Sequence, residues 1–420
     1  MGLLTHSNML LCENYQKYGR LASKDLGSVR SAGSPGVVRV HWVRTEAIRP
    51  GMRLGRTIVG ADGRVLLIAG TVLRESLIEP LVRQGIAAVY IVNELAPDVV
   101  PQDVVSDEAR QGLKQDMSAF MGQVTQSFVN AARKGISRYA SGVDTGRLLQ
   151  AVGRIVDDVM TNPRAVFHLQ DIRTADEYTL GHCVNVCVLA TLVGTSMDLG
   201  HSELKDLALG AVLHDIGKVL TPPDILNKVA ALTPEEFAVI KQHTTSGWNM
   251  LKEQLDIPYT AAIVALQHHE RWLGGGYPAG TKGEQIFKYS RICALADCFD
   301  ALTSDRVYRK GAPPGRALEI METGMQGFFE PTLMDRFLQC VAPYPVGSLV
   351  QITGDLQAVV VNVARGRTSL PRIRILLDAE GNQLGEPAEV ELAEHPEIEI
   401  KALLREEAVA FTPETLIAAG

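Results

Sequence analysis

The sequence lacks the features of a secreted or membrane-spanning protein. Its six cysteines are scattered and include no Cys-x-x-Cys pair, so neither a disulfide framework nor a thiolate zinc site is indicated. No stretch approaches the ~18 uninterrupted apolar residues that a spanning helix needs, and the N-terminus has no basic segment followed by a long apolar core. These absences predict a soluble protein of the reducing cytoplasm.

An excess of positive charge is absent as well. The formal net charge is −7 and the isoelectric point is about 5.9, so the chain offers no basic stripe for a nucleic acid duplex. A small anionic substrate held in one pocket is compatible with this charge. The sequence also has no internal repeat of fixed period, no cyclase signature and no receiver-domain pattern, so it does not reveal an input signal.

Hydrophobic periodicity divides the 420 residues into several parts. We expect a disordered tail over 1–37, a small α+β module over 38–95, a linker with an amphipathic helix over 96–142, a helical domain over 143–342, and a small β unit with a C-terminal tail over 343–420. The module is expected to contain four short strands, in VRVHWV, MRLGRTIV, GRVLLIAG and AAVYIV, and a helix from Glu75 to Gln84. The predicted fold class is therefore multi-domain and mainly α, with a helical bundle between two small modules.

Helix starts and strand patterns support this division. Ser106 can cap a helix that carries one apolar face, and a packed face is favoured there over a signalling coiled coil. The segment Thr233-Pro234-Glu235-Glu236 combines a capping box with proline at the first helical position. Alternation at period two in SLVQIT, AVVVNVA, RIRILL and AEVEL predicts the strands of the C-terminal unit, with a turn over residues 378–382.

Histidines and aspartates in the helical part lie between apolar neighbours, as in AVLHDIGK, IVALQHHE and ICALADCFD. Buried imidazoles and carboxylates are costly unless they are paired, and a metal centre would pair several at once. Adjacent helical residues point ~100° apart, so His214 and Asp215 can straddle two metals, with Asp215 as the bridge. An imidazole-rich site without thiolates suits iron, manganese or zinc better than calcium.

His214-Asp215 followed by Gly217-Lys218, with HHERWLGGGYP downstream, resembles the HD-GYP family of HD-superfamily phosphohydrolases. Together with LTPEEFAVIKQHTTSG and ADCFDALTSDRVYR, the resemblance covers about residues 178–309. It implies an HD-type helical bundle and hydrolysis of cyclic di-GMP to linear pGpG, GMP or both by a metal-bridged hydroxide. The implied cofactors are two divalent ions, iron or manganese, with zinc as an alternative. The implied ligands of one metal are His182, His214, Asp215 and Asp297, and those of the other are Asp215, His243, His268 and His269.

Cationic side chains near these ligands are candidates for substrate contact. Lys218 follows His214 by one helical turn and is expected to bind a phosphate and to serve catalysis. Arg306 and Arg309 are expected either to contact phosphate or to form surface ion pairs. Around the ligands, Asp300 and Asp305 are expected to cap helices or hold a metal ligand in place, and Glu270 to orient an imidazole.

The segment from Gly274 to Pro278 leaves regular structure directly after two histidines. Gly274 and Gly276 allow backbone angles and close approaches that a β-carbon would obstruct, and Tyr277 is expected to meet a guanine or a phosphate. The alternative is an ordinary surface turn. The family resemblance implies that this loop also binds partners, the GGDEF domains of diguanylate cyclases; a homodimer is left open.

Two questions stay open at this stage. A three-metal variant of the family has a glutamate four residues before the first histidine ligand, where this chain has Tyr178, so we predict two metals; Glu177 would point elsewhere on a continuous helix. The alternatives to cyclic di-GMP hydrolysis are a hydrolase of another nucleotide and a regulatory scaffold without catalysis.

Overall fold

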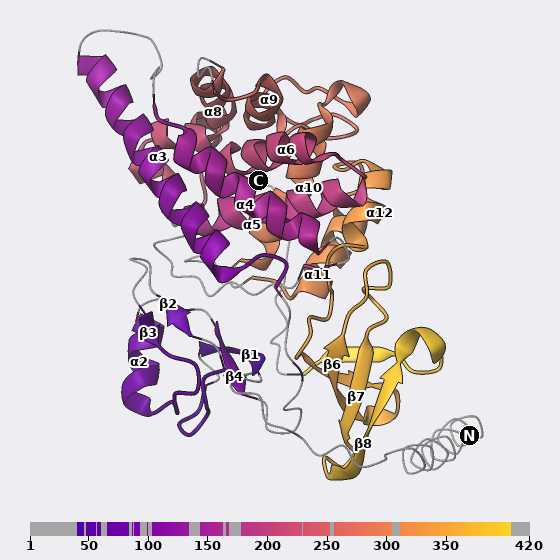
Figure 1. Cartoon of the computed structure of the whole chain (residues 1–420). Helices are drawn as coiled ribbons and strands as arrows, with labels where there is room; N and C mark the ends of the chain where they lie inside the picture. The colour runs from indigo at the N-terminus through magenta and orange to yellow at the C-terminus, as the bar shows by residue number, and fades with distance from the viewer. Residues whose placement is uncertain are drawn as a thin grey trace. The chain divides into compact units, whose positions relative to one another are not determined.

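The computed structural model describes fourteen stretches of the chain: 40–45, 48–55, 57–59, 65–83, 86, 88–92, 99, 103–133, 143–162, 165–167, 178–228, 230–252, 256–304 and 311–404. Within them the protein is mainly helical, with a small antiparallel sheet near the C-terminus (Figure 1). The described residues form two compact units. The first combines the described residues between 40 and 99 with residues 344–404, and the second contains the described residues between 103 and 343.

The second unit is a bundle of helices around one hydrophobic core. Its helices are α3 (Asp107–Arg133), α4 (Gly146–Thr161), α5 (Tyr178–Ser196), α6 (His201–Leu213), α7 (Pro223–Leu226), α8 (Pro234–Leu251), α9 (Tyr259–Gln267), α10 (Lys288–Thr303), α11 (Pro314–Glu319) and α12 (Pro331–Leu338). Short 3₁₀ segments, η3 (Ile216–Leu220) and η4 (Gly283–Gln285), and a π-helical segment, η5 (Ile320–Gly324), connect some of them.

Helix α5 lies at the centre of this bundle, where it packs against α6 and α10. From His182 to Val193 every residue of α5 is buried, and the helix has apolar residues on all its faces. A helix of this kind is stable only inside a core. Its position therefore brings His182, in its first turns, into the interior of the bundle.

Both helix starts that the sequence predicts are confirmed. The Thr233 hydroxyl accepts a hydrogen bond from the Glu236 amide at 3.3 Å, and the Glu236 carboxylate accepts one from the Thr233 amide at 2.7 Å. At α3, the Ser106 hydroxyl accepts from the Ala109 amide. The apolar face of α3 is buried in the bundle core through Leu113, Met117, Phe120 and Val124, so it is a packed face, and Figure 1 shows α3 alongside α4.

The first unit contains a five-stranded antiparallel sheet in the order β8-β7-β6-β5-β9. Its strands are β5 (Leu349–Ile352), β6 (Gln357–Asn362), β7 (Arg372–Leu377), β8 (Gln383–Glu391) and β9 (Ile400–Leu403). Four of the five were predicted, and the turn between β7 and β8 is closed by the Asn382 amide, which donates to the Asp378 carboxylate at 2.7 Å. The edge strand β9 was missed because Lys401 and Ala402 are both exposed, so no alternation marks it.

The described residues before 93 form two small antiparallel pairs and a helix. The pairs are β1 (Val40–Arg44) with β4 (Ala88–Val92) and β2 (Ile58–Val59) with β3 (Val65–Leu67), and the helix is α2 (Glu75–Arg83). These elements coincide with the predicted ones, although β2 is shorter than expected. The predicted tail over 1–37 lies outside the described residues.

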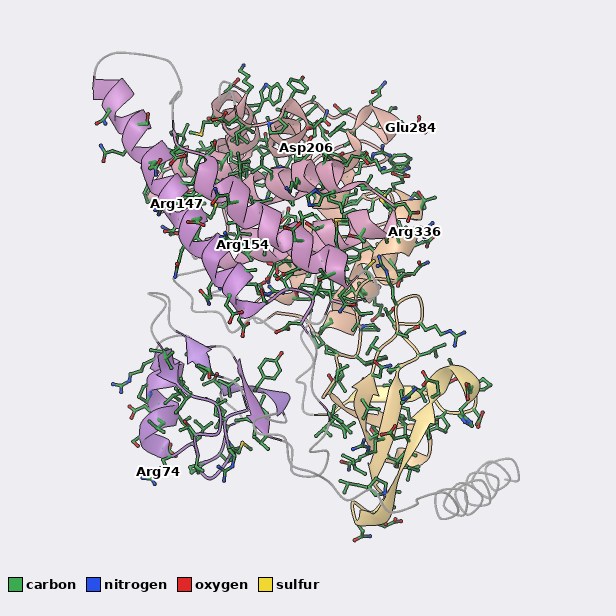
Figure 2. All side chains as sticks on the ribbon, in the orientation of Figure 1. Arg74, Arg147, Arg154, Asp206, Glu284 and Arg336 are labelled. Carbon is green, nitrogen blue, oxygen red and sulfur yellow. The ribbon has the colours of Figure 1, made fainter. Side chains whose placement is uncertain are left out.

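Figure 2 labels five charged residues of the helical unit. Arg147, Arg154, Glu284 and Arg336 are exposed, and Asp206 is half-buried. No helix among the described residues combines the length and the apolar character that crossing a membrane requires.

Candidate metal centre

The predicted metal ligands come from five places in the helical unit and meet in its interior. His182 lies on α5, His214 and Asp215 directly follow α6, His243 lies on α8, His268 and His269 directly follow α9, and Asp297 lies on α10. Ligand atoms of these residues form three overlapping groups in which all atoms lie within 4.8 Å of one another. The groups are Asp215, His243, His268, His269; then His182, His214, Asp215; and finally His214, His268, Asp297.

Asp215 lies between two sets of imidazoles. Its Oδ1 is 3.4 Å from His243 Nε2 and 3.8 Å from His268 Nε2. Its Oδ2 is 3.4 Å from His214 Nε2 and 3.9 Å from His182 Nε2. Because each oxygen faces a different set, one carboxylate is placed to serve two cations at once.

The histidine rings are oriented by hydrogen bonds on their far nitrogens. The Nδ1 atoms of His214 and His243 lie 2.7 Å from the carbonyls of Ala211 and Ile240, and His268 Nδ1 lies 3.1 Å from the Val264 carbonyl. A carbonyl only accepts hydrogen bonds, so the proton of each neutral ring is on Nδ1. Each Nε2 therefore directs a lone pair toward Asp215.

Two of these lone pairs face each other directly. His243 Nε2 and His268 Nε2 are 3.2 Å apart, and with the protons on Nδ1 neither nitrogen can donate to the other. In addition, His214 Nε2, Asp215 Oδ1 and His269 Nε2 are buried and make no hydrogen bond within the described part of the chain. Buried acceptors facing one another are unfavourable, and a divalent cation would satisfy them. The donor set thus fits a metal centre, and nitrogen and carboxylate ligands alone do not separate iron, manganese and zinc.

Burial keeps the imidazoles neutral, which is the form that binds metal. It lowers the pKa of His243 to about 4 and that of His268 to about 3, and it lowers the pKa of His269 well below its usual range. Burial alone would raise the pKa of the Asp215 carboxyl, but the positive charge of the adjacent Lys218 outweighs this effect and holds that pKa well below normal. At neutral pH His243, His268 and His269 are therefore neutral, and Asp215 and Asp297 are ionised.

Gly217 explains how η3 comes so close to α8. A β-carbon at this position would lie 2.0 Å from the His243 carbonyl oxygen and 2.6 Å from the Gly247 amide nitrogen. Only glycine allows the two backbones to approach in this way. This contact brings Asp215 to within reach of His243, and the sequence analysis gave Gly217 no structural role.

Lys218 lies beside the centre but contacts a ligand. Its Nζ donates to Asp215 Oδ2 at 2.6 Å, and 28% of its side chain is exposed. The lysine thus balances the charge of the carboxylate that faces both imidazole sets, while its exposed part leaves it within reach of a bound anion.

Asp300 and Glu270 are two acidic residues beside the candidate ligands, and they make different contacts. Asp300 Oδ2 accepts a hydrogen bond from His182 Nδ1 at 2.7 Å, as one of the two expectations for Asp300 had it. Glu270 Oε1 accepts a hydrogen bond from the Ala279 amide at 2.8 Å, so this residue fastens the loop that follows the two histidines. Its Oε2 is buried without a hydrogen bond in the described structure, and the expectation that Glu270 orients an imidazole stays a prediction.

That loop returns onto the backbone of the metal ligands. Gly274 and Gly275 adopt positive φ angles of 92° and 80°. A β-carbon on Gly276 would lie 2.5 Å from both the Glu270 Cα and the His269 carbonyl oxygen, so the expected close approach is confirmed. The Tyr277 ring packs on the His269 ring, with centroids 4.6 Å apart, and its hydroxyl is buried without a hydrogen bond in the described structure.

A pocket opens next to the centre, between α8, the loop and α10. Its lining includes the ligands His268, His269 and Asp297 and the aromatic residues Phe237, Tyr277, Phe328 and Phe329. Two cations also line it: Lys241, whose Nζ is 5.1 Å from the Phe237 ring centroid, and Arg271, whose guanidinium lies 3.8 Å from the Phe328 ring centroid. Sequence analysis missed both, because a lysine and an arginine in helical or loop segments carry no motif of their own.

Several predicted residues lie outside the described part of the chain. These are Arg306, Arg309, Asp305 and Glu177, and the side chain of Tyr178.

Comparison with protein families finds an HD domain over residues 168–333. This range contains every residue of the candidate centre, the loop and all the residues that line the pocket.

The chain is similar to characterised proteins over part of its length. It is 36% identical over 244 residues to a cyclic di-GMP phosphodiesterase of Pseudomonas aeruginosa, which covers 58% of this chain and 58% of that protein. It is 35% identical over 154 residues to a 3'3'-cGAMP-specific phosphodiesterase of Vibrio cholerae, covering 37% of this chain and 33% of that one. Among solved structures, an HDGYP protein from Bdellovibrio bacteriovorus matches with a TM-score of 0.45 and 17% identity, over 71% of this chain and 98% of that protein.

Proposed function

From the HD domain found over residues 168–333, we propose that the chain belongs to the HD-GYP family and is a metal-dependent phosphodiesterase that hydrolyses cyclic di-GMP. The observation that carries this proposal is the set of buried, unprotonated Nε2 atoms that converge on the two oxygens of Asp215. In a core without a cation, buried lone pairs that face one another are unfavourable. In a metal site the same lone pairs bind the ion.

The residues that would hold the metals divide into two sets that share Asp215. His182 and His214 face Asp215 Oδ2, and His243 and His268 face its Oδ1. Asp297 lies beside the first pair, with its Oδ1 3.1 Å from His182 Nε2 and 3.9 Å from His214 Nε2, and His269 groups with the second pair. Two divalent ions in such sets supply charge neutralisation at the phosphodiester and lower the pKa of a water molecule. The number of two rests on these seven ligands, and iron or manganese is favoured, with zinc as the alternative.

The chain's own residues then orient and neutralise the substrate. Lys218 can turn from Asp215 toward a phosphate oxygen once cations take over the charge balance there. Lys241 and Arg271 add positive charge along the pocket, which suits an anionic diester. The aromatic rings of Phe237, Phe328 and Tyr277 offer faces on which a purine can stack.

Cyclic di-GMP is favoured as substrate because the relative from Pseudomonas aeruginosa bears that name and matches over 58% of each chain. The relative from Vibrio cholerae is named for 3'3'-cGAMP, which makes a cyclic dinucleotide with mixed bases the second candidate. We propose linear pGpG as the main product, since two metals suffice to open one diester bond.

The loop from Gly274 to Pro278 is proposed as the partner-binding element, with a GGDEF domain as its partner. Leu273, directly before it, has 73% of its surface exposed, and an exposed apolar side chain of this size suits a protein contact.

The decisive test is anaerobic purification followed by metal analysis and product analysis. We expect about two divalent ions per chain and conversion of cyclic di-GMP to the linear dinucleotide. Parallel assays with 3'3'-cGAMP and with pGpG determine the substrate preference and the final product. Metal-loaded protein that leaves all three nucleotides unchanged would overturn the proposed function.

A further inference from the structure

A buried arginine on α3 connects to the centre through a chain of hydrogen bonds. Arg110 has 9% of its surface exposed, and its Nη1 donates to Asn185 Oδ1 on α5 at 3.0 Å. An arginine side chain is always charged and has donors only. Because burying such a charge is costly unless it is compensated, its place in the core is a constraint on the residues around it.

Asn185 passes this connection to α10. Its Nδ2 donates to Asp300 Oδ1 at 2.9 Å, and 1% of the asparagine surface is exposed. The arginine can only donate and the carboxylate can only accept, so the two partners fix the orientation of the amide between them. The amide thus joins a buried positive charge to a buried negative one.

Asp300 completes the chain at a metal ligand. It is fully buried, and its Oδ2 accepts from His182 Nδ1 at 2.7 Å and from the Ser304 hydroxyl at 3.2 Å. On the other side of the ring, His182 Nε2 lies 3.1 Å from Asp297 Oδ1. A carboxylate on the far nitrogen of a histidine sets the ring's orientation and its strength as a ligand.

We propose that Arg110 is a positioning residue for the metal centre, acting through Asn185 and Asp300 on the orientation of His182. The proposal rests on the proposed function, since it assumes that His182 binds metal. Arg110 is connected to His182 through these two intervening side chains. The affinity of the site that contains His182 therefore depends on how α3, the first helix of the second unit, packs against α5.

The test measures metal affinity, so it does not depend on turnover. Metal-free protein is titrated with Co²⁺ under anaerobic conditions, and binding is followed by the visible absorption of the bound ion. For Arg110→Met we expect the affinity of one of the two sites to fall by about 10-fold or more, while the other site and the helical circular dichroism stay near wild type. Arg110→Lys, which keeps the charge and a donor, should recover part of the loss.

Arg154→Met is the matched control. Arg154 on α4 forms an ion pair with Asp116 on α3, with its Nη2 3.5 Å from Asp116 Oδ2. About half of the Arg154 side chain is exposed. The substitution removes an arginine contact to the same helix without touching the Arg110 chain. Its Co²⁺ affinity should equal that of the wild type.

A double variant separates positioning from general loosening of the core. If Arg110 acts through Asp300, then Arg110→Met combined with Asp300→Asn should weaken Co²⁺ binding little more than Asp300→Asn alone. Additive losses, or a wild-type affinity in Arg110→Met, overturn the proposal. If Arg110→Met does not fold, Asp300→Asn and Arg110→Lys supply the same comparison. Wild-type protein that binds no Co²⁺ would instead overturn the proposed function itself.

Discussion

Asp215 is the residue on which both imidazole sets depend. Replacing it by asparagine keeps the shape but removes the charge that faces His214 and His243 at 3.4 Å. We expect Asp215→Asn to lose bound metal as well as turnover, because one change affects both sites. Elemental analysis of the purified variant checks this, and wild-type metal content would contradict the bridging role.

Lys218 should behave differently, because it contacts the proposed ligand Asp215 and is not itself a proposed ligand. For Lys218→Ala we expect turnover of the diester to fall by about 10²-fold, the range of a lost electrostatic contact in a catalytic site. Metal content should stay near that of the wild type. Lys228→Ala, which breaks an ion pair with Glu236, is the control and should retain activity. Unchanged turnover in Lys218→Ala would reduce the lysine to a charge-balancing role.

At the scale of an element, the glycine loop is held by its backbone contact with the metal ligands. Gly276→Val would drive side-chain atoms into the peptide of His269, so the loop must move away from the pocket. We expect activity to fall by at least ~10-fold, with helical content unchanged, since the loop lies outside the bundle core. Circular dichroism and turnover measured together check this.

Gly280→Ala, two residues beyond this loop, provides the comparison. Gly280 has a positive φ of 68° but open space around its α-carbon, so alanine adds only ~1–2 kcal/mol of local strain. Activity close to that of the wild type is expected. Equal damage from both substitutions would show that loop strain, and not contact with His269, is what matters.

The helices could be predicted because their signals are local. The capping box at Thr233 lies within one helical turn, and the apolar face of α3 is a repeat within a single helix. The contacts that build the centre are not local: His182 and Asp300 are 118 residues apart, and Arg110 and Asn185 are 75 apart. Family motifs supplied the ligand set, but no spacing reveals Lys241, Arg271 or the role of Gly217, because each depends on which backbones meet in three dimensions.

For the whole molecule, the buried imidazoles make the metal-free protein sensitive to acid. The pKa values of His243 and His268 in the folded protein, about 4 and about 3, lie below the ordinary 6.5. Below about pH 6.5 the unfolded chain therefore binds more protons at these two histidines than the folded protein does. The free energy of unfolding falls progressively as the pH drops toward the folded-state pKa values. We expect the free energy of unfolding of metal-free protein to drop by about 3 kcal/mol or more between neutral pH and about pH 4.5.

Denaturant titrations of the metal-free protein at several pH values measure this loss. His243→Gln combined with His268→Gln is the matched variant, and it should show a flatter dependence because fewer buried imidazoles must be protonated. A pH profile as steep as that of the wild type would assign the acid sensitivity to other groups.

The series of hydrogen bonds from Arg110 to His182 also implies a reciprocal effect of metal binding on helix α3. If the seating of α3 changes the affinity for a metal ion, then binding of that ion must change the free energy of seating α3 by the same amount. A cell that varies its supply of iron or manganese would thereby alter the solvent protection of a helix that holds no metal ligand. Metal availability would then act on this protein as an allosteric signal, read out at the first helix of the second unit.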